Sequence, residues 1–177
     1  MTSARSLGLA AGASLALALL TSAADAPLTT VPSVDLDRYV GRWHQIAYYP
    51  NFFQRACTGA TTAEYAKHDD RTLSVVNTCE TQAGQKRAEG VARVVGPAKL
   101  EVRFAPAWLS FLPFVWGDYW IIDLAPDYSY AVVGTPNRKY LWILARSPSL
   151  DPATYQRILE HLPALGYDPA KLVRTSS

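Results

Sequence analysis

Short segments in which apolar and polar residues alternate recur along most of the chain. In the clearest of them, three charged residues alternate with Leu100, Val102 and Phe104. A period of two places the two sets on opposite faces of a β-strand. We therefore predict a strand here with one buried face and one face in water.

Turn residues separate eight segments of this kind. They are Trp43 to Tyr49, Thr58 to Ala66, Thr72 to Thr81, Lys86 to Val95, Lys99 to Ala105, Trp116 to Leu124, Ser129 to Gly134 and Lys139 to Arg146. Because each strand is followed closely by the next, the order favours an all-β, up-and-down antiparallel barrel over a crossover fold.

A single helix follows the strands. Asp151 is a good N-cap and Pro152 suits the first helical position. Apolar residues then recur at helical spacing until Pro163: Tyr155, Ile158, Leu159 and Leu162. We expect this helix to pack against the barrel wall, and we expect Lys171 to Arg174 to return to a sheet edge.

Composition agrees with one domain that has a large apolar interior. The chain has 177 residues, of which 49% are hydrophobic, with 5 Trp, 10 Tyr and 5 Phe. The formal charge of +2 and the lack of a long basic run give no reason to expect nucleic-acid binding.

The N-terminus has the pattern of a secretory signal peptide. Arg5 precedes an uncharged run of 14 residues, Leu7 to Leu20, which is short for a membrane span. We predict a leader over 1–24, with cleavage after Ala24 or Ala26, a linker over 25–33 and the domain over 34–177. Since no cysteine lies near these sites, we expect no acyl anchor and a protein that is exported to the periplasm or secreted. An uncleaved membrane anchor is the alternative.

Export makes a disulfide between the two cysteines plausible. If the second and third strands form a hairpin centred on His68, Cys57 lies opposite Cys79. Such a bridge contributes about 3 kcal/mol to stability. The alternative is a nucleophilic free thiol inside the barrel.

Several motifs, in order along the chain, resemble those of the lipocalin family. They are Gly41-Arg42-Trp43-His44-Gln45-Ile46-Ala47, then Tyr49, Pro50, Phe53 and Gln54, then Gly117-Asp118-Tyr119-Trp120-Ile121-Ile122-Asp123-Leu124, and last Tyr140-Leu141-Trp142-Ile143-Leu144-Ala145-Arg146. They are most similar to the bacterial outer-membrane lipocalins and the apolipoprotein D-like group. Gly117 stands where the family has threonine.

The first and last motifs predict how one end of the barrel is closed. The first and eighth strands are neighbours in a closed barrel, so Arg146 can lie over the indole of Trp43. A shielded cation–π contact of this kind contributes about 1–2 kcal/mol. Gly41 lets the incoming backbone pass close beneath. We assign these three residues to the barrel floor.

Alternation predicts the residues that face the interior, with the family pattern setting the parity of the last three strands. The predicted ligand-binding lining is Ala47, Tyr49, Ala63, Val75, Asn77, Val94, Val102, Phe104, Tyr119, Ile121, Val133, Tyr140 and Trp142. Small inward residues, among them Ala92 and Ala131, favour a cavity over a filled barrel. The expected ligand is a fatty acid, a lysophospholipid or a similar lipid, bound for storage or transport in the cell envelope.

The segment from Ala105 to Trp116 is unusually apolar for a loop between strands. It carries Trp108, Leu109, Phe111, Leu112 and Phe114. A loop of this kind should not stand bare in water. It is a lid, a homodimer contact, a segment folded back on the protein or a wedge for peripheral contact with a membrane, and we favour the membrane wedge.

No pattern indicates catalysis, and we expect neither a cofactor nor a metal. His44, His68 and His161 lack the spacing of metal ligands. Two alternatives stay open. One is a scavenger of haem or pigment, and the other is a barrel enzyme that acts on a bound lipid through Tyr119 or Tyr140.

Overall fold

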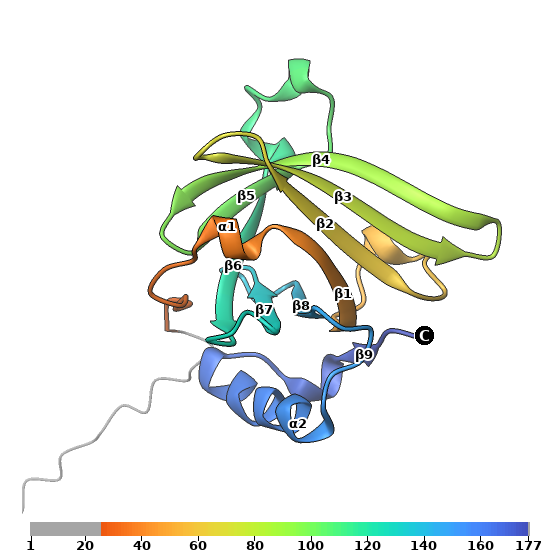
Figure 1. Ribbon diagram of the computed structural model, residues 1–177, viewed down its shortest axis with the longest axis vertical. Helices are drawn as coiled ribbons and strands as arrows, with labels where there is room; N and C mark the ends of the chain where they lie inside the picture. Colours follow the sequence, from red (N-terminus) through yellow and green to blue (C-terminus); the bar gives the residue numbers. More distant parts are fainter. Residues whose placement is uncertain (1–25, 177) are drawn as a thin grey trace, which may run out of the picture.

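The computed structural model describes residues 26–176, and the predicted leader lies outside them apart from the alternative cleavage position at Ala26. Its elements follow one another as a run of strands and then a helical C-terminal part (Figure 1). They are α1 (Leu36–Tyr39), β1 (Gly41–Tyr48), η1 (Phe52–Gln54), β2 (Thr61–Lys67), β3 (Thr72–Thr81), β4 (Gly84–Gly96), β5 (Lys99–Arg103), η2 (Ala107–Leu109), η3 (Pro113–Val115), β6 (Gly117–Leu124), β7 (Tyr130–Gly134), β8 (Leu141–Ala145), α2 (Pro152–His161), η4 (Leu162–Leu165), η5 (Pro169–Lys171) and β9 (Val173–Arg174).

The strands form a closed antiparallel barrel, as predicted. Each of β2 to β7 pairs with the next strand along the chain, and β1 pairs with both β8 and β2. The short β9 pairs with the C-terminal end of β1, beyond the residues that pair with β2, and Tyr48 lies opposite Val173 there. The predicted return of the C-terminal segment to a sheet edge is therefore confirmed.

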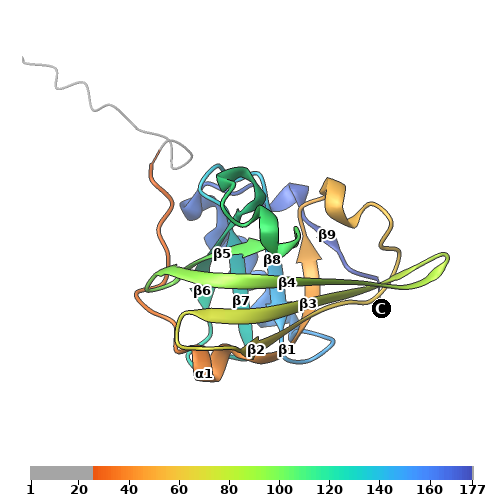
Figure 2. The same cartoon turned by 90° about the horizontal axis from the view of Figure 1, so that it is seen from above.

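The barrel has a closed end and an open end. The segment 35–40, including α1, lies at the closed end, which we call the floor. The open end, which we call the mouth, is formed by residues 49–60, 82–83, 104–116 and 135–140. Figure 2 shows α1 on the side opposite to η1 and the η2–η3 loop.

The C-terminal helix covers one side of the barrel wall. The Asp151 side chain accepts a hydrogen bond from the Thr154 N–H, which confirms the predicted N-cap. Ile158 and Leu162 are buried against the outer faces of β1, β6, β7 and β8. A helix this short is marginal in water, so this packing is what stabilises it.

Two apolar clusters result, one on each side of this wall. The inner cluster consists of Tyr39, Trp43, Tyr65, Leu73, Val75, Ala92, Ala98, Leu100, Tyr119, Ile121, Ala131, Val133 and Leu144. The outer cluster consists of Leu28, Ile46, Ala47, Tyr49, Ile122, Val132, Leu141, Ile143, Ala145, Ile158, Leu162, Leu165 and Tyr167.

The prediction that Ala47 and Tyr49 face the interior is wrong. A bulge interrupts the pairing of β1 with β8 between Gln45 and Ala47. One extra residue reverses the alternation of a strand. Beyond the bulge Ala47 therefore points outward, and Tyr49 packs on Tyr167 with ring centroids 5.8 Å apart.

The β2–β3 hairpin has a different register from the predicted one. Thr61 pairs with Cys79 and Lys67 with Leu73, because the turn is centred two residues later than His68. The Asp69 carboxylate accepts the Arg71 N–H within this turn. A short polar side chain of this kind stabilises a turn locally.

The predicted disulfide is nevertheless present. Cys57 lies before β2, and its Cα is 5.6 Å from that of Cys79. Thr58 donates its N–H to the carbonyl of Glu80, whose own N–H is donated to the carbonyl of Ala60. This irregular step offsets the shift in register, so the pairing was right although the register that predicted it was wrong.

Residues 26–33 belong to the predicted linker, but they pack along the barrel wall. Leu28 is buried in the outer cluster, and the Val31 N–H is donated to the carbonyl of Ile121. Within residues 26–176, no helix is long and apolar enough to cross a membrane.

Candidate functional site

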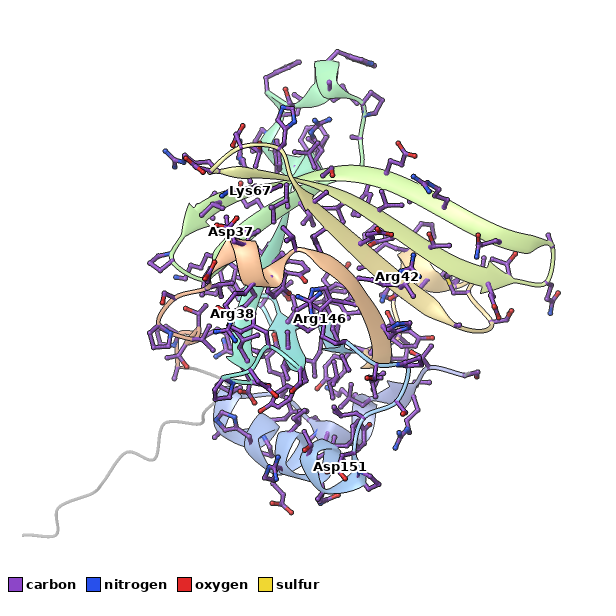
Figure 3. The ribbon with its side chains drawn as sticks, in the orientation of Figure 1. Asp37, Arg38, Arg42, Lys67, Arg146 and Asp151 are labelled. Carbon is purple, nitrogen blue, oxygen red and sulfur yellow. A yellow bond between two sulfur atoms is a disulfide. The ribbon has the colours of Figure 1, made fainter. Side chains whose placement is uncertain are left out.

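The floor of the barrel is built around Trp43 and Arg146. The guanidinium carbon of Arg146 lies 3.8 Å from the centre of the Trp43 ring system. The same guanidinium donates to the backbone carbonyls of Arg42, Arg38 and Tyr39, as its place beside α1 in Figure 3 suggests. Gly41 has φ +95°, and a Cβ there would lie 3.3 Å from the Arg146 side chain. The floor therefore has the predicted geometry.

Three tyrosines form a hydrogen-bonded chain just above the floor. The Tyr65 hydroxyl donates to that of Tyr119 over 2.8 Å, and the Tyr119 and Tyr39 hydroxyls are 2.7 Å apart. Burial raises the pKa of Tyr65 to about 12 and that of Tyr39 and Tyr119 well above the usual value. At neutral pH all three are uncharged and are poor general bases.

The interior above these tyrosines is apolar. Most of the predicted lining residues belong to the inner cluster or pack against it: Ala63, Val75, Val94, Val102, Tyr119, Ile121, Val133 and Trp142. Arg103 is the one buried Asp, Glu, Lys or Arg side chain among the described residues, and its guanidinium lies beside the ring of Trp116 in the mouth loop. The neutral Asn77 pairs with Ala63 and so shares its inward face.

Gly90 on β4 leaves room for the aromatic side chain of Phe104, which follows β5. A Cβ on Gly90 would lie 2.7 Å from the ring of Phe104, so the phenyl group covers this glycine. Phe104 is 43% exposed, which places it at the upper, open part of the interior. Its predicted inward orientation agrees with this position.

A network of amide side chains connects the mouth to the barrel. Gln54 accepts a hydrogen bond from the Trp142 indole N–H and donates one to Gln45. Tyr140 stacks on Trp142 at 5.8 Å and lies 5.9 Å from Phe53. Tyr140 and Trp142, which we predicted to line the interior, thus form an aromatic rim with η1 at the mouth.

Three residues of the interior were not predicted from the sequence. Tyr39 was left unassigned because it precedes the first predicted strand. Tyr48 takes the inward place that was assigned to Tyr49, since the bulge changes the parity of β1. Leu144 continues the inward series of Tyr140 and Trp142 and could have been found from that alternation.

The apolar mouth loop does not fold back on the barrel. Trp108, Phe111 and Phe114 are largely exposed, whereas Leu109 and Leu112 are half-buried. Trp116 fixes the end of the loop, because Arg93 stacks over its ring at 4.0 Å and its indole N–H is donated to Ser110.

The histidines are far from the interior. His44 lies on the outer face of β1, His68 in the β2–β3 turn and His161 at the end of α2, 3.6 Å from Asp123. Within residues 26–176, no group of three or more His, Cys, Asp or Glu side chains is arranged to hold a metal ion.

A comparison with protein families shows that residues 34–177 match the family model of the lipocalin-like domain. The chain belongs to the lipocalin family. It is 39% identical to temperature-induced lipocalin-1 of Arabidopsis thaliana over 155 residues, which cover 84% of this chain and 82% of the relative. It is 33% identical to the outer membrane lipoprotein Blc of Escherichia coli over 177 residues, 96% of each chain.

Solved structures support the fold of this lipocalin. Insecticyanin of the tobacco hornworm Manduca sexta superposes with a TM-score of 0.64 at 24% identity, covering 85% of this chain and 84% of that one. Lipocalins bind small hydrophobic ligands and are generally binding or transport proteins. An apolar barrel with one open end agrees with that general role.

Proposed function

We propose that this lipocalin binds a single-chain lipid, such as a fatty acid or lysophospholipid, and carries it within the cell envelope. The observation behind the proposal is the apolar and aromatic lining formed by the inner cluster and the residues that pack against it. A lining of this kind favours an acyl chain, because each buried methylene contributes about 0.8 kcal/mol.

The lining also supports one orientation of the ligand. An ionised head group deep in the barrel would lie among the apolar side chains of the inner cluster, and unpaired buried charge is very costly. We therefore infer that the acyl chain enters first and the head group stays at the mouth. Lys86 follows the inward parity of β4, opposite Cys79, and can reach an acidic head group there.

Envelope location is supported by the disulfide and by the similarity to outer membrane lipoproteins. Disulfides persist in oxidising compartments outside the cytoplasm. We propose that the leader is cleaved and that the mature protein is periplasmic or secreted. Mass measurement of the N-terminus of the exported protein tests both points.

A haem or pigment carrier is the competing proposal. Histidine is a common axial ligand of haem iron, and all three histidines lie outside the interior. The buried tyrosines favour a neutral ligand environment. Absorbance of the purified protein in the visible range decides between a pigment and a colourless lipid.

The decisive experiment fills the interior with one side chain. Val102→Trp places an indole in the lining, whereas Val95→Trp places it on the exposed outer face of the neighbouring strand. After delipidation, a fluorescent acyl probe should bind the unaltered protein and Val95→Trp equally, and Val102→Trp at least about tenfold more weakly. Equal binding by both variants, or no binding of any acyl probe, would contradict the proposal.

A further inference from the structure

Five aromatic side chains at the mouth are exposed to an unusual extent. The η2–η3 loop presents Trp108, Phe111 and Phe114 at 72%, 75% and 78% exposure, and η1 presents Phe52 and Phe53 at 70% and 66%. Figure 2 shows both segments on the same side of the molecule, opposite to α1. Exposed apolar groups gathered in this way mark an interaction surface.

The η2–η3 loop holds its aromatic residues in place without burying them. Two consecutive turns are closed by backbone hydrogen bonds, from Leu109 N to Pro106 O and from Trp116 N to Pro113 O. The guanidinium groups of Arg93 and Arg103 lie 4.0 Å and 5.2 Å from the centre of the Trp116 ring. The loop therefore has a defined conformation that exposes its aromatic side chains to solvent.

The charge of the mouth points to an anionic surface as the partner. The four mouth segments contain Arg55, Arg138 and Lys139 and no Asp or Glu. Lys171 joins Arg138 and Lys139 around a pocket of about 450 Å³ beside Tyr49 and Pro50. By contrast, the floor segments 35–40, 68–71, 97–98, 125–129 and 146–151 carry six aspartates and three arginines.

The described chain also begins at this end of the barrel. The Ala26 carbonyl accepts a hydrogen bond of 2.6 Å from the Arg138 guanidinium, in the mouth segment between β7 and β8. The segment from Ala26 to Val34 therefore runs along the barrel wall from the mouth towards the floor.

We propose that the mouth docks face-down on an anionic phospholipid bilayer, with the aromatic residues of η1 and the η2–η3 loop in the interface and the cations at Arg55, Lys139 and Lys171 beside the head groups. Aromatic residues favour this interfacial depth, and basic residues add attraction to anionic lipid. The docking does not depend on the ligand, but it serves the proposed function, because a lipid would pass between bilayer and barrel without crossing water.

Vesicle flotation tests the docking with the exported protein purified from its host. The vesicles contain either phosphatidylcholine alone or phosphatidylcholine and phosphatidylglycerol in equal amounts. Binding should be at least about tenfold stronger to the anionic vesicles and should weaken as salt is raised. Equal binding to both vesicles would overturn the choice of an anionic surface.

Two matched pairs of variants test which end of the barrel docks. The triple variant Trp108→Ser, Phe111→Ser and Phe114→Ser should lose binding at least about tenfold, whereas Val95→Ser, an exposed apolar side chain on the wall, should not. Lys139→Glu with Lys171→Glu should weaken binding to anionic vesicles, whereas Arg71→Glu with Arg157→Glu should not. If each control behaves like its partner, the docking is wrong.

Quenching by brominated lipid gives an independent measure of orientation. The emission of Trp108, obtained as the difference between the protein and its Trp108→Phe variant, should be quenched in anionic vesicles. Acyl-probe binding in the absence of vesicles should be unchanged in the mouth variants, so failure of docking and failure of lipid binding are separable. An exported protein that is a dimer in solution, with Trp108 shielded from aqueous quenchers, would overturn the proposal in favour of a homodimer contact.

Discussion

The hydrogen-bonded tyrosines above the floor predict that the loss of stability on removing one hydroxyl group depends on how many hydrogen bonds that hydroxyl makes. Tyr119 is the central member, hydrogen-bonded to both Tyr65 and Tyr39. Tyr119→Phe removes both bonds and leaves two buried hydroxyls without a partner. Tyr65→Phe removes one bond, and the Tyr119 hydroxyl keeps its other partner. The two substitutions are chemically identical, so each is the control of the other.

The magnitudes follow from the number of bonds and orphaned groups. A buried hydrogen bond contributes about 1 kcal/mol net, and an unsatisfied buried hydroxyl costs about 1–3 kcal/mol. Tyr119→Phe should therefore lower the free energy of unfolding by about 3 kcal/mol or more, and Tyr65→Phe by about 1 kcal/mol. For a domain of this size these values correspond to decreases in Tm of roughly 6–12 °C and 2–4 °C.

Thermal and urea unfolding of both variants, followed by circular dichroism, measures the difference. Replacing all three tyrosines by phenylalanine should cost less than Tyr119→Phe alone, because no orphaned hydroxyl remains. If Tyr119→Phe were no more destabilising than Tyr65→Phe, the hydroxyls would have other partners and the reasoning would be refuted.

Three further predictions concern the stability of the barrel. Replacing Cys57 and Cys79 by alanine opens a loop with a sequence separation of 22 and should cost about 3 kcal/mol in urea unfolding; a loss below about 1 kcal/mol would contradict this. Arg146→Ala should cost about 2–4 kcal/mol, through the cation–π contact with Trp43 and the lost backbone hydrogen bonds, while acyl-probe binding is retained. The pKa of Tyr65, raised to about 12, predicts that stability falls as pH rises from about 10 to about 12, because only the unfolded state releases the proton in that window; a flat unfolding profile there would argue against it.

The sequence predicted strands and their order well because turn residues separate them. It predicted the floor well for a different reason, since Trp43 and Arg146 become neighbours in any closed barrel of eight strands. It failed where one residue changes the parity of a strand. Nothing in the run from Gln45 to Ala47 signals a bulge, because Ile46 and Ala47 are apolar and suit either face.

The hairpin register shows a related limit. The turn residues His68 to Arg71 were recognised as polar, but their centre depends on which backbone groups pair. The Asp69 carboxylate and the Thr72 carbonyl determine that pairing in the structure. The cross-strand pairing therefore differs from the prediction by four residues, since Cys79 lies opposite Thr61 and not opposite Cys57, although the predicted disulfide is present.

The alternation of apolar and polar residues predicted which side chains face the interior only where one face of the strand is in contact with water. The strand β5 lies on the bare side, so its charged residues point outward and its apolar residues inward. The wall under α2 is buried on both faces, and Ile121-Ile122 on β6 and Ala131-Val132-Val133 on β7 are consecutive apolar runs there. Consecutive runs carry no period of two, so the parity of these strands had to come from the family pattern.

The same asymmetry explains why the interior lining is harder to derive than the fold. The residues that would contact a ligand on β6 to β8 alternate with residues of the outer cluster that are equally apolar, so composition cannot separate a binding residue from a packing residue. Only the position of the helix does so, because it identifies the outward set. Substitutions at Val132 and Val133, neighbours of the same type on opposite faces, should therefore separate the two roles: Val133→Ala should change both stability and acyl-probe binding, and Val132→Ala stability alone. Equal effects on probe binding would show that the two faces of this wall are not independent.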